Sequence, residues 1–139
     1  MKVHRAEVEA STRGHCDTHD LTGALREAIA SSGVREGQAL VFVPGSTAGV
    51  TTMEFEPGLR KDLPEFFERL APEKADYHHQ ATWGDDNGAS HVRAALLGPS
   101  VVVPVSRGEP LLGTWQQVVV VDFDTQPRQR RVWLQVIGE

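Results

Sequence analysis

The stretch GTWQQVVVVDFDTQPRQRRVWLQVI, residues 113–137, decides the fold class of this chain. It contains two β-patterned segments, residues 113–124 and 130–137, separated by a short link that contains a proline. Apolar residues occupy every other position of the second segment, which is the two-residue period of a strand. We expect the two segments to pair as a terminal hairpin. Trp133 lies on the opposite face of its strand, so we expect that face to be covered too, by helices or by another subunit.

The rest of the chain adds four strands and three helices. We expect strands at residues 2–10, 39–43, 46–54 and 101–105, with loops at 11–20 and 72–86. We expect helices from residue 21 to just before Gly33, from near Asp62 to just before Pro72, and over residues 88–97 with Asn87 as N-cap. The strands at 39–43 and 46–54 are close enough to pair as a second hairpin. Because helices and strands are segregated more than they alternate, the sequence predicts an α+β fold with a largely antiparallel sheet.

The bulk composition is that of an ordinary globular protein. The 139 residues fit a single domain, 1–139, and the net charge is −5 without a basic stripe, so we expect no nucleic-acid partner. One cysteine, Cys16, cannot form an internal disulfide, which fits a reducing compartment. No apolar run is long enough to cross a bilayer, and the charged N-terminus lacks the apolar segment of a secretion signal. We therefore expect a cytoplasmic protein with no membrane partner.

Two polar residues of the predicted short helix point to a site. Asn87 and His91 are four residues apart and share one helix face. His91 could act as an acid or base positioned by Asn87, with Glu54 as a carboxylate partner. Alternatively His79 and His91 could bind a metal ion, with Glu54 or the acids before Asn87 completing the ligands. The same pattern also fits a capped helix with a locally satisfied histidine.

A second group of residues suits an anion. Gly113 and Thr114 follow a turn, where backbone N–H groups and a hydroxyl can approach a phosphate, and Gln116 adds an amide. Arg93 and Arg107 could supply positive charge. The sequence contains no glycine-rich nucleotide-binding motif and no GxSxG nucleophile motif.

Taken together, these spaced residues resemble the YjbQ family, small proteins sometimes labelled secondary thiamine-phosphate synthases. The resemblance covers essentially the whole chain, and its most specific part is residues 87–116. The matching residues are Asp20–Thr22, Ser46–Val50, Glu54, Asp62–Leu63, Tyr77–His79, Asp86–Asn87, His91, Leu96–Gly98, Pro104, Leu112–Gln116, Arg130 and Val136–Glu139.

The resemblance implies two packed, mostly antiparallel β-sheets with two main helices and one short helix, assembled as a homotrimer. It implies a polar pocket near the subunit interface, built from Glu54, His79, Asn87, His91 and the turn at 113–116. The implied activity is thiamine-phosphate synthesis, in which a pyrimidine methyl group moves from its diphosphate to thiazole phosphate. The implied partner is thus a phosphorylated metabolite, and the implied cofactor is Mg²⁺ or another divalent metal.

One position departs from the family pattern. Relatives typically begin the second strand of this region with His-Thr-Thr-Ala, whereas this chain has Gly45-Ser46-Thr47-Ala48, so a histidine is missing. Two alternatives to a synthase therefore stay open. One is a non-catalytic trimer that binds a small ligand, and the other is a metal-dependent hydrolase that uses His79 and His91.

Overall fold

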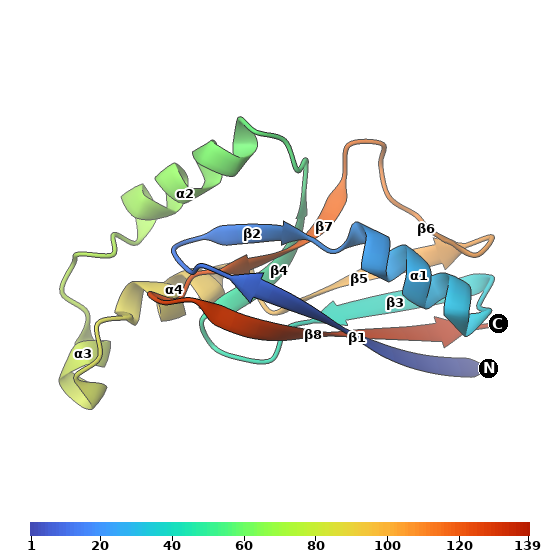
Figure 1. Ribbon diagram of the computed structural model, residues 1–139, viewed down its shortest axis with the longest axis horizontal. Coiled ribbons are helices and arrows are strands. Elements are labelled where there is room, and N and C mark those ends of the chain that lie inside the picture. The colour runs from blue at the N-terminus through green and yellow to red at the C-terminus, as the bar shows by residue number, and fades with distance from the viewer.

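The computed structural model describes residues 1–139, which form two antiparallel sheets and four helices (Figure 1). The strands are β1 (Lys2–Thr12), β2 (Asp17–Asp20), β3 (Glu36–Phe42), β4 (Ala48–Met53), β5 (Ser100–Ser106), β6 (Glu109–Pro110), β7 (Gln117–Asp122) and β8 (Arg128–Gly138). The helices are α1 (Thr22–Ser32), α2 (Leu59–Leu70), α3 (His78–Trp83) and α4 (Gly88–Leu97). The predicted α+β class with antiparallel sheets is confirmed.

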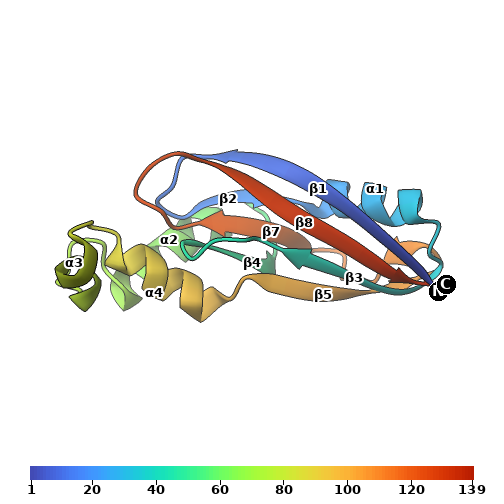
Figure 2. The ribbon, with the colours of Figure 1, turned by 90° about the horizontal axis from the view of Figure 1, so that it is seen from below.

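The larger sheet has the strand order β1-β8-β3-β5-β6. Its long inner strand β8 pairs with the whole of β1, from Lys2 opposite Gly138 to Thr12 opposite Arg128. The alternating valines and leucine of β8 face the main core and are fully buried. Because β1 and β8 are antiparallel neighbours, the two chain ends lie together (Figure 1, Figure 2).

The smaller sheet has the order β2-β7-β4, with β7 in its centre. All four valines of β7, residues 118–121, are buried. Val118 and Val120 join the main core between the two sheets, whereas Val119 and Val121 contact a second apolar cluster beneath α2 and α4. A strand that is covered on both faces carries a continuous apolar run instead of an alternating one. The smaller sheet thus lies between α2 and the larger sheet, as Figure 1 shows.

Both predicted hairpins are wrong, because each pair of strands is divided between the two sheets. β7 belongs to the smaller sheet and β8 to the larger one, and the same holds for β4 and β3. Both edges of β7 are already paired, with β2 on one side and β4 on the other, so no edge remains for β8. The link after β7 therefore crosses from one sheet to the other. Two buried acids hold this crossing in position. Asp122, at the end of β7, accepts a hydrogen bond from Arg130, and Asp124, in the link, accepts one from Arg128.

Several element boundaries also differ from the prediction. The expected loop at 11–20 contains β2, which pairs with β7. Helix α2 begins at Leu59, three residues early, because the Glu56 carboxylate accepts hydrogen bonds from the N–H groups of Gly58 and Leu59. The expected loop at 72–86 contains α3, a helix with no buried residue and therefore no apolar pattern. β7 starts at Gln117, and residues 113–116 form a turn.

The remaining helices agree with the sequence. Helix α1 ends at Gly33, whose φ of 69° is the left-handed conformation that glycine adopts without strain, and α4 spans the predicted residues Gly88–Leu97. None of the four helices has the length and apolarity needed to span a bilayer. The outer face of the larger sheet carries no further layer of the same chain (Figure 2), and Trp133 there is covered only in part, with the Arg5 guanidinium 5.1 Å from its ring centre.

Candidate functional site

Helices α3 and α4 bring two imidazoles together. The ring centres of His79 on α3 and His91 on α4 are 4.3 Å apart, with the planes tilted by 42°. The first residue of α4, Gly88, sits against the Tyr77 side chain just before α3, and a Cβ at this position would collide with it. The glycine thus allows the close approach of the two helices that places the histidines in contact.

Two buried polar atoms at this junction lack hydrogen-bond partners. Asn87 Oδ1 accepts from no donor, and the Asn87 side chain does not cap α4 although the residue occupies the N-cap position. His79 Nε2 lies 3.0 Å from Asp85 Oδ1, but the contact lacks hydrogen-bond geometry, so this nitrogen is also unsatisfied. Buried polar atoms without partners are rare and costly, and they mark places where a water or a ligand group is needed.

A cavity of about 360 Å³ lies beside His91, between α4 and the connection from β3 to β4. Its volume is in the range of small-molecule sites. The position of the missing histidine, Gly45, and the retained His91 therefore line the same cavity. The full lining consists of Gly45, Ser46, Ala48, His91, Ala94, Ala95 and Pro99.

Glu54 lies away from the histidines within one chain. It follows the last residue of β4, whereas the His91 cavity touches Ala48 at the first. Six residues of strand separate the two positions by about 20 Å, at about 3.3 Å per residue. The predicted synthase pocket therefore cannot form from Glu54 and His91 of the same subunit.

The turn at 113–116 lies at the Glu54 end of β4. Gln116 Nε2 donates to Thr52 Oγ1 at 3.1 Å, and Gln116 Oε1 accepts from the Gly113 N–H at 3.0 Å. Gly113, Thr114 and Gln116 are all exposed. The turn and Glu54 thus form one exposed polar end of the smaller sheet, and the histidines form the other.

The two arginines that the sequence suggested for anion binding lie elsewhere. Arg93 is 2% exposed; its Nε donates to the Ala71 carbonyl at 3.0 Å and its Nη2 to Glu68 Oε2 at 2.8 Å. These bonds tie α4 to the end of α2. Arg107 lies in the β5–β6 turn, and its backbone N–H donates to Glu36 Oε1 at 2.9 Å. Neither residue lines the His91 cavity.

Sequence reasoning missed a buried ionic network next to the cavity. Arg130 Nε and Nη2 donate to the two carboxylate oxygens of Asp122 at 2.7 and 2.9 Å, and Nη2 also donates to Thr47 Oγ1 at 2.7 Å. Asp124 accepts from Thr47 Oγ1 at 3.1 Å and from Arg128 Nε at 2.9 Å. The sequence did contain one indication of this network. Two acids, Asp122 and Asp124, directly follow the apolar run of β7, and acids so close to a buried strand need charged partners.

Electrostatics in this network favour the charged forms. Burial alone would raise the pKa of Asp124, but hydrogen bonds from the Thr125 N–H, Arg128 and Thr47 outweigh it and hold that pKa below its ordinary value of 3.8. Hydrogen bonds to Asp122 raise the pKa of Arg130 above its ordinary value, against the opposing effect of burial. Asp124 and Arg130 are therefore charged at neutral pH.

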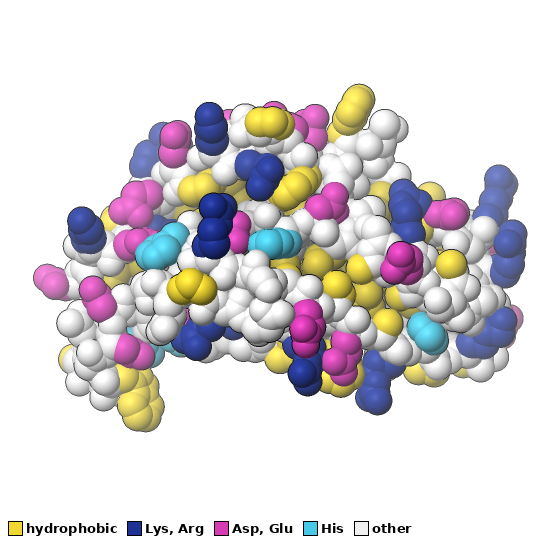
Figure 3. All heavy atoms as spheres, viewed as in Figure 1, with side chains coloured by type: hydrophobic (Ala, Val, Ile, Leu, Met, Phe, Trp, Pro, Cys, Tyr) yellow, Lys and Arg dark blue, Asp and Glu magenta, His cyan; other side chains and the backbone are white.

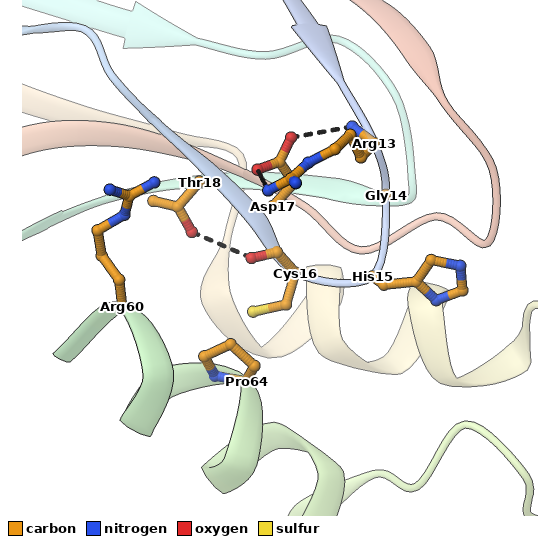
Figure 4. A pocket seen from close by; sticks show the side chains of 8 residues that line it. All are labelled: Arg13, Gly14, His15, Cys16, Asp17, Thr18, Arg60 and Pro64. Carbon is orange, nitrogen blue, oxygen red and sulfur yellow. Dashed lines mark hydrogen bonds and ion pairs between the residues drawn. The ribbon is translucent and has the colours of Figure 1, made fainter. Parts of the chain in front are cut away.

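A second hollow, of about 330 Å³, lies between the β1–β2 connection and α2, with Cys16 in its wall (Figure 4). Figure 4 shows the Cys16 sulfur directed toward the α2 side, where Pro64 lies. Burial raises the pKa of the Cys16 thiol from 9.0 to about 12, although the charge of Arg93 opposes the shift. A thiol with this pKa is not a nucleophile at neutral pH.

Metal ligands are too few at the histidines. No three His, Cys, Asp or Glu side chains in the chain lie close enough together to hold one ion. His79 contacts His91 and Asp85, but Mg²⁺ prefers oxygen ligands, and the two imidazoles contact one another. The residues of a single chain therefore do not fit the divalent ion that the resemblance implies.

Comparison with known proteins gives the family. Residues 6–139 match the model of the family described as UPF0047 protein YjbQ-like. A UPF0047 protein of Archaeoglobus fulgidus is 39% identical over 126 residues, covering 91% of this chain and 95% of the relative. One of Mycobacterium tuberculosis is 41% identical over 119 residues, covering 85% and 89%.

The chain belongs to the YjbQ family.

Solved YjbQ-type structures share the whole fold. A YbjQ-like protein of unknown function from Sulfolobus solfataricus superimposes with a TM-score of 0.94 at 30% identity, covering 99% of both chains. A YjbQ/UPF0047 family protein from Clostridium acetobutylicum gives 0.87 at 32% identity, covering 95% of this chain and 99% of the other. The resemblance to YjbQ that the sequence indicated is thus confirmed, and the family is one of unknown function.

The surface of this YjbQ-family chain mixes its charges. On the face shown in Figure 3, Lys and Arg side chains alternate with Asp and Glu, and apolar patches lie between them. This face therefore carries no broad surface of a single charge sign.

Proposed function

We propose that this protein binds a phosphorylated small metabolite beside His91 and transfers a carbon group from it. The observation that carries the proposal is the His79–His91 pair, with two unsatisfied buried polar atoms next to a cavity of about 360 Å³. Such a site has room for a small ligand and offers it the His91 imidazole, with Asn87 one helical turn away. We further propose that it works in the cytoplasm.

The reaction that suits these groups is thiamine-phosphate formation. The bond between the pyrimidine methylene and its diphosphate breaks, the diphosphate leaves with the electron pair, and the thiazole nitrogen forms the new carbon–nitrogen bond. His91 donates a proton or hydrogen bond to the leaving oxygen, which lowers the barrier to its departure. We assign Asn87, one helical turn away, to the positioning of His91.

The proposal includes a homotrimer, because the Glu54 end of β4 is too distant to act on a ligand at His91 of the same chain. A neighbouring subunit could present Glu54 and the turn at 113–116 to that cavity. Leu111 and Trp115, next to the turn, are 66% and 71% exposed, which is a feature of surfaces that contact another protein. Assembly would bury these side chains and complete the pocket.

The direct test is to mix the purified protein with both thiamine precursors and Mg²⁺ and to measure thiamine phosphate. We expect the His91→Ala and Asn87→Ala variants to lose most of the yield. The matched control is His78→Ala, because His78 is the exposed neighbour of His79 on α3. An equal yield from His91→Ala and His78→Ala would remove the cavity from the mechanism.

A second candidate is a binding protein without turnover. The separation of Glu54 from His91 and the glycine at position 45 favour it, because a catalytic cavity would need more side chains than this one has. In that case thiamine phosphate or its precursors would raise the melting temperature without being consumed. Consumption of the precursors with formation of thiamine phosphate by the wild type would reject a purely binding role.

A further inference from the structure

Hydrogen bonds fix the Arg130 guanidinium through two of its nitrogens, whereas the third, Nη1, has no partner in the chain. Its Nε and Nη2 are bound to Asp122, which is fully buried, and to Thr47, which is 6% exposed. No protein group accepts a hydrogen bond from Nη1. Because two of its nitrogens are held, the guanidinium cannot swing away, and Nη1 is a charged donor in a set direction.

The unpartnered Nη1 of Arg130 faces Gly45. A Cβ built on Gly45 would lie 3.1 Å from Arg130 Nη1, so only the lack of a side chain keeps this approach open. Gly45 also has a φ of +124°, a conformation that other residues rarely adopt. Gly45 lines the His91 cavity, so Nη1 lies directly behind that part of the cavity wall, and Arg130 itself lines a neighbouring hollow.

The same wall contains further donors. Gly45 and Ser46 lie in the connection before β4, and neither backbone N–H donates to a backbone or side-chain acceptor of the chain. Ser46 adds a hydroxyl, and His91 lines the opposite side of the cavity on α4. Several unused N–H groups beside a fixed guanidinium are suited to an acceptor with several oxygens.

The hollow that Arg130 itself lines is less suitable for an anion. Its volume is about 510 Å³, and Glu9 contributes a negative charge to its lining. Its second arginine, Arg131, already contacts Glu7 at 3.4 Å and Glu9 at 3.9 Å. The donors without partners are therefore on the Gly45 side.

We propose that Arg130 Nη1, the backbone N–H groups of Gly45 and Ser46 and the Ser46 hydroxyl form an oxyanion site that holds the phosphate of a phosphate monoester. The remaining space, toward His91, takes the organic part of the ligand. The inference rests on the proposed function in using the same cavity, and it assigns the recognition of the ligand's phosphate to residues that the sequence did not indicate.

The test is a titration of the full-length, ¹⁵N-labelled protein with inorganic phosphate, followed by NMR at constant ionic strength. We expect saturable shifts of the Gly45 and Ser46 amide signals and of the Arg130 Nε signal. The Arg130→Lys variant keeps a positive charge beside Asp122 but has no second nitrogen that could replace Nη1. It should weaken phosphate binding about tenfold. Arg128→Lys is the matched control, since Arg128 belongs to the same network but pairs with Asp124, and it should bind as the wild type does.

Further variants guard against a folding defect. Ser46→Ala removes one exposed hydroxyl and should weaken phosphate binding several-fold without a change in melting temperature. Gly45→Ala should block the approach to Nη1. No saturable shift at Gly45 and Ser46 in the wild type, or equal affinities for Arg130→Lys and Arg128→Lys, would overturn the site.

A second titration with glycerol phosphate separates a monoester from free phosphate. If glycerol phosphate binds more tightly than inorganic phosphate, and His91→Ala removes this difference, the assignment to a monoester is supported. If both ligands bind equally and His91→Ala changes neither affinity, that assignment is overturned. The two proposals can fail separately. Phosphate binding without thiamine-phosphate formation rejects only the transfer reaction, and turnover without the phosphate shifts rejects only the oxyanion site.

Discussion

At the scale of single residues, buried charges in this protein are stable because each has several partners. Asp122 is fully buried, yet both of its oxygens accept from the Arg130 guanidinium, which is the strong two-point geometry. Asp124 beside it is held by Thr47 and Arg128. These groups fasten the chain where it crosses from β7 to β8. The removal of one partner would leave another charge buried without compensation.

The Asp124 carboxyl should make stability depend on acid. Its pKa is lower in the folded chain than in the unfolded chain, so its contribution is present above pH 3.8 and is lost as the pH falls through the folded value. We expect Asp124→Asn to reduce the free energy of unfolding by about 1–3 kcal/mol near neutral pH. The difference from the wild type should shrink below pH 3.8, as measured by urea unfolding at several pH values. Asp62→Asn, at an exposed position on α2, is the control, and an equal loss from both variants would contradict the prediction.

The Cys16 thiol should be almost inert in the folded protein. It is 4% exposed and its pKa is raised to about 12 by burial, so the reactive thiolate is scarce at neutral pH. We expect alkylation by iodoacetamide to be orders of magnitude slower than in the urea-unfolded chain. Mass spectrometry of timed samples measures both rates. Rapid labelling of the native protein would show that the hollow in Figure 4 admits reagents to the sulfur and would contradict this assignment.

Residue-level prediction from the sequence succeeded where one local rule sufficed. Asn87 was expected as the N-cap of a helix over 88–97 that carries His91, and it occupies that position before α4. It could not find the Arg130 site, because that site depends on β8, the link before β4 and the end of β7, which are far apart in sequence. Arg93 looked equally suitable for an anion, and only its bonds to Ala71 and Glu68 show its structural use.

At the scale of elements, the composition of the strands explains which predictions failed. The valine run of β7 was identified as a strand, but its continuity also indicated cover on both faces, which a terminal hairpin does not give. Helix α3 has no buried residue, so no apolar periodicity marked it. Helix α2 was placed three residues late, because the Glu56 side chain starts it and Pro64 is tolerated within its second turn.

Arg93 should act as a clamp between elements and not as a ligand-binding group. Arg93→Met removes the bonds from α4 to the Ala71 carbonyl and to Glu68 and should destabilise the fold by about 1–3 kcal/mol. Hydrogen exchange should rise at the end of α2 and in α3, where the clamp is lost. Phosphate affinity, measured in the same titration as above, should not change. If Arg93→Met instead weakened phosphate binding and left hydrogen exchange unchanged, Arg93 would be an anion-binding residue, as the sequence suggested.

At the scale of the whole molecule, the exposed apolar surface near the turn at 113–116 should be the contact between subunits. The patch consists of Val102, Leu111 and Trp115, and part of the β5 edge beside it has no strand partner beyond β6. We expect light scattering to give the mass of a trimer for the wild type and a smaller species for Trp115→Glu.

Trp83→Glu, at the equally exposed tryptophan of α3, is the matched control and should remain trimeric. A wild type that is monomeric at micromolar concentration would reject the assembly, and with it the supply of Glu54 by a neighbouring subunit. The sequence could not reveal this surface from its pattern, because a single exposed tryptophan looks the same whether it faces solvent or another copy.

The pairing of β1 with β8 sets Lys2 opposite Gly138, in one ladder of hydrogen bonds. Neighbouring Cα atoms in such a ladder are only about 5 Å apart. A short glycine linker could therefore join the native ends, and new ends could be opened near Lys74 in the connection between α2 and α3. Such a circular permutant would retain every strand of both sheets while separating the helix that bears His79 from α2.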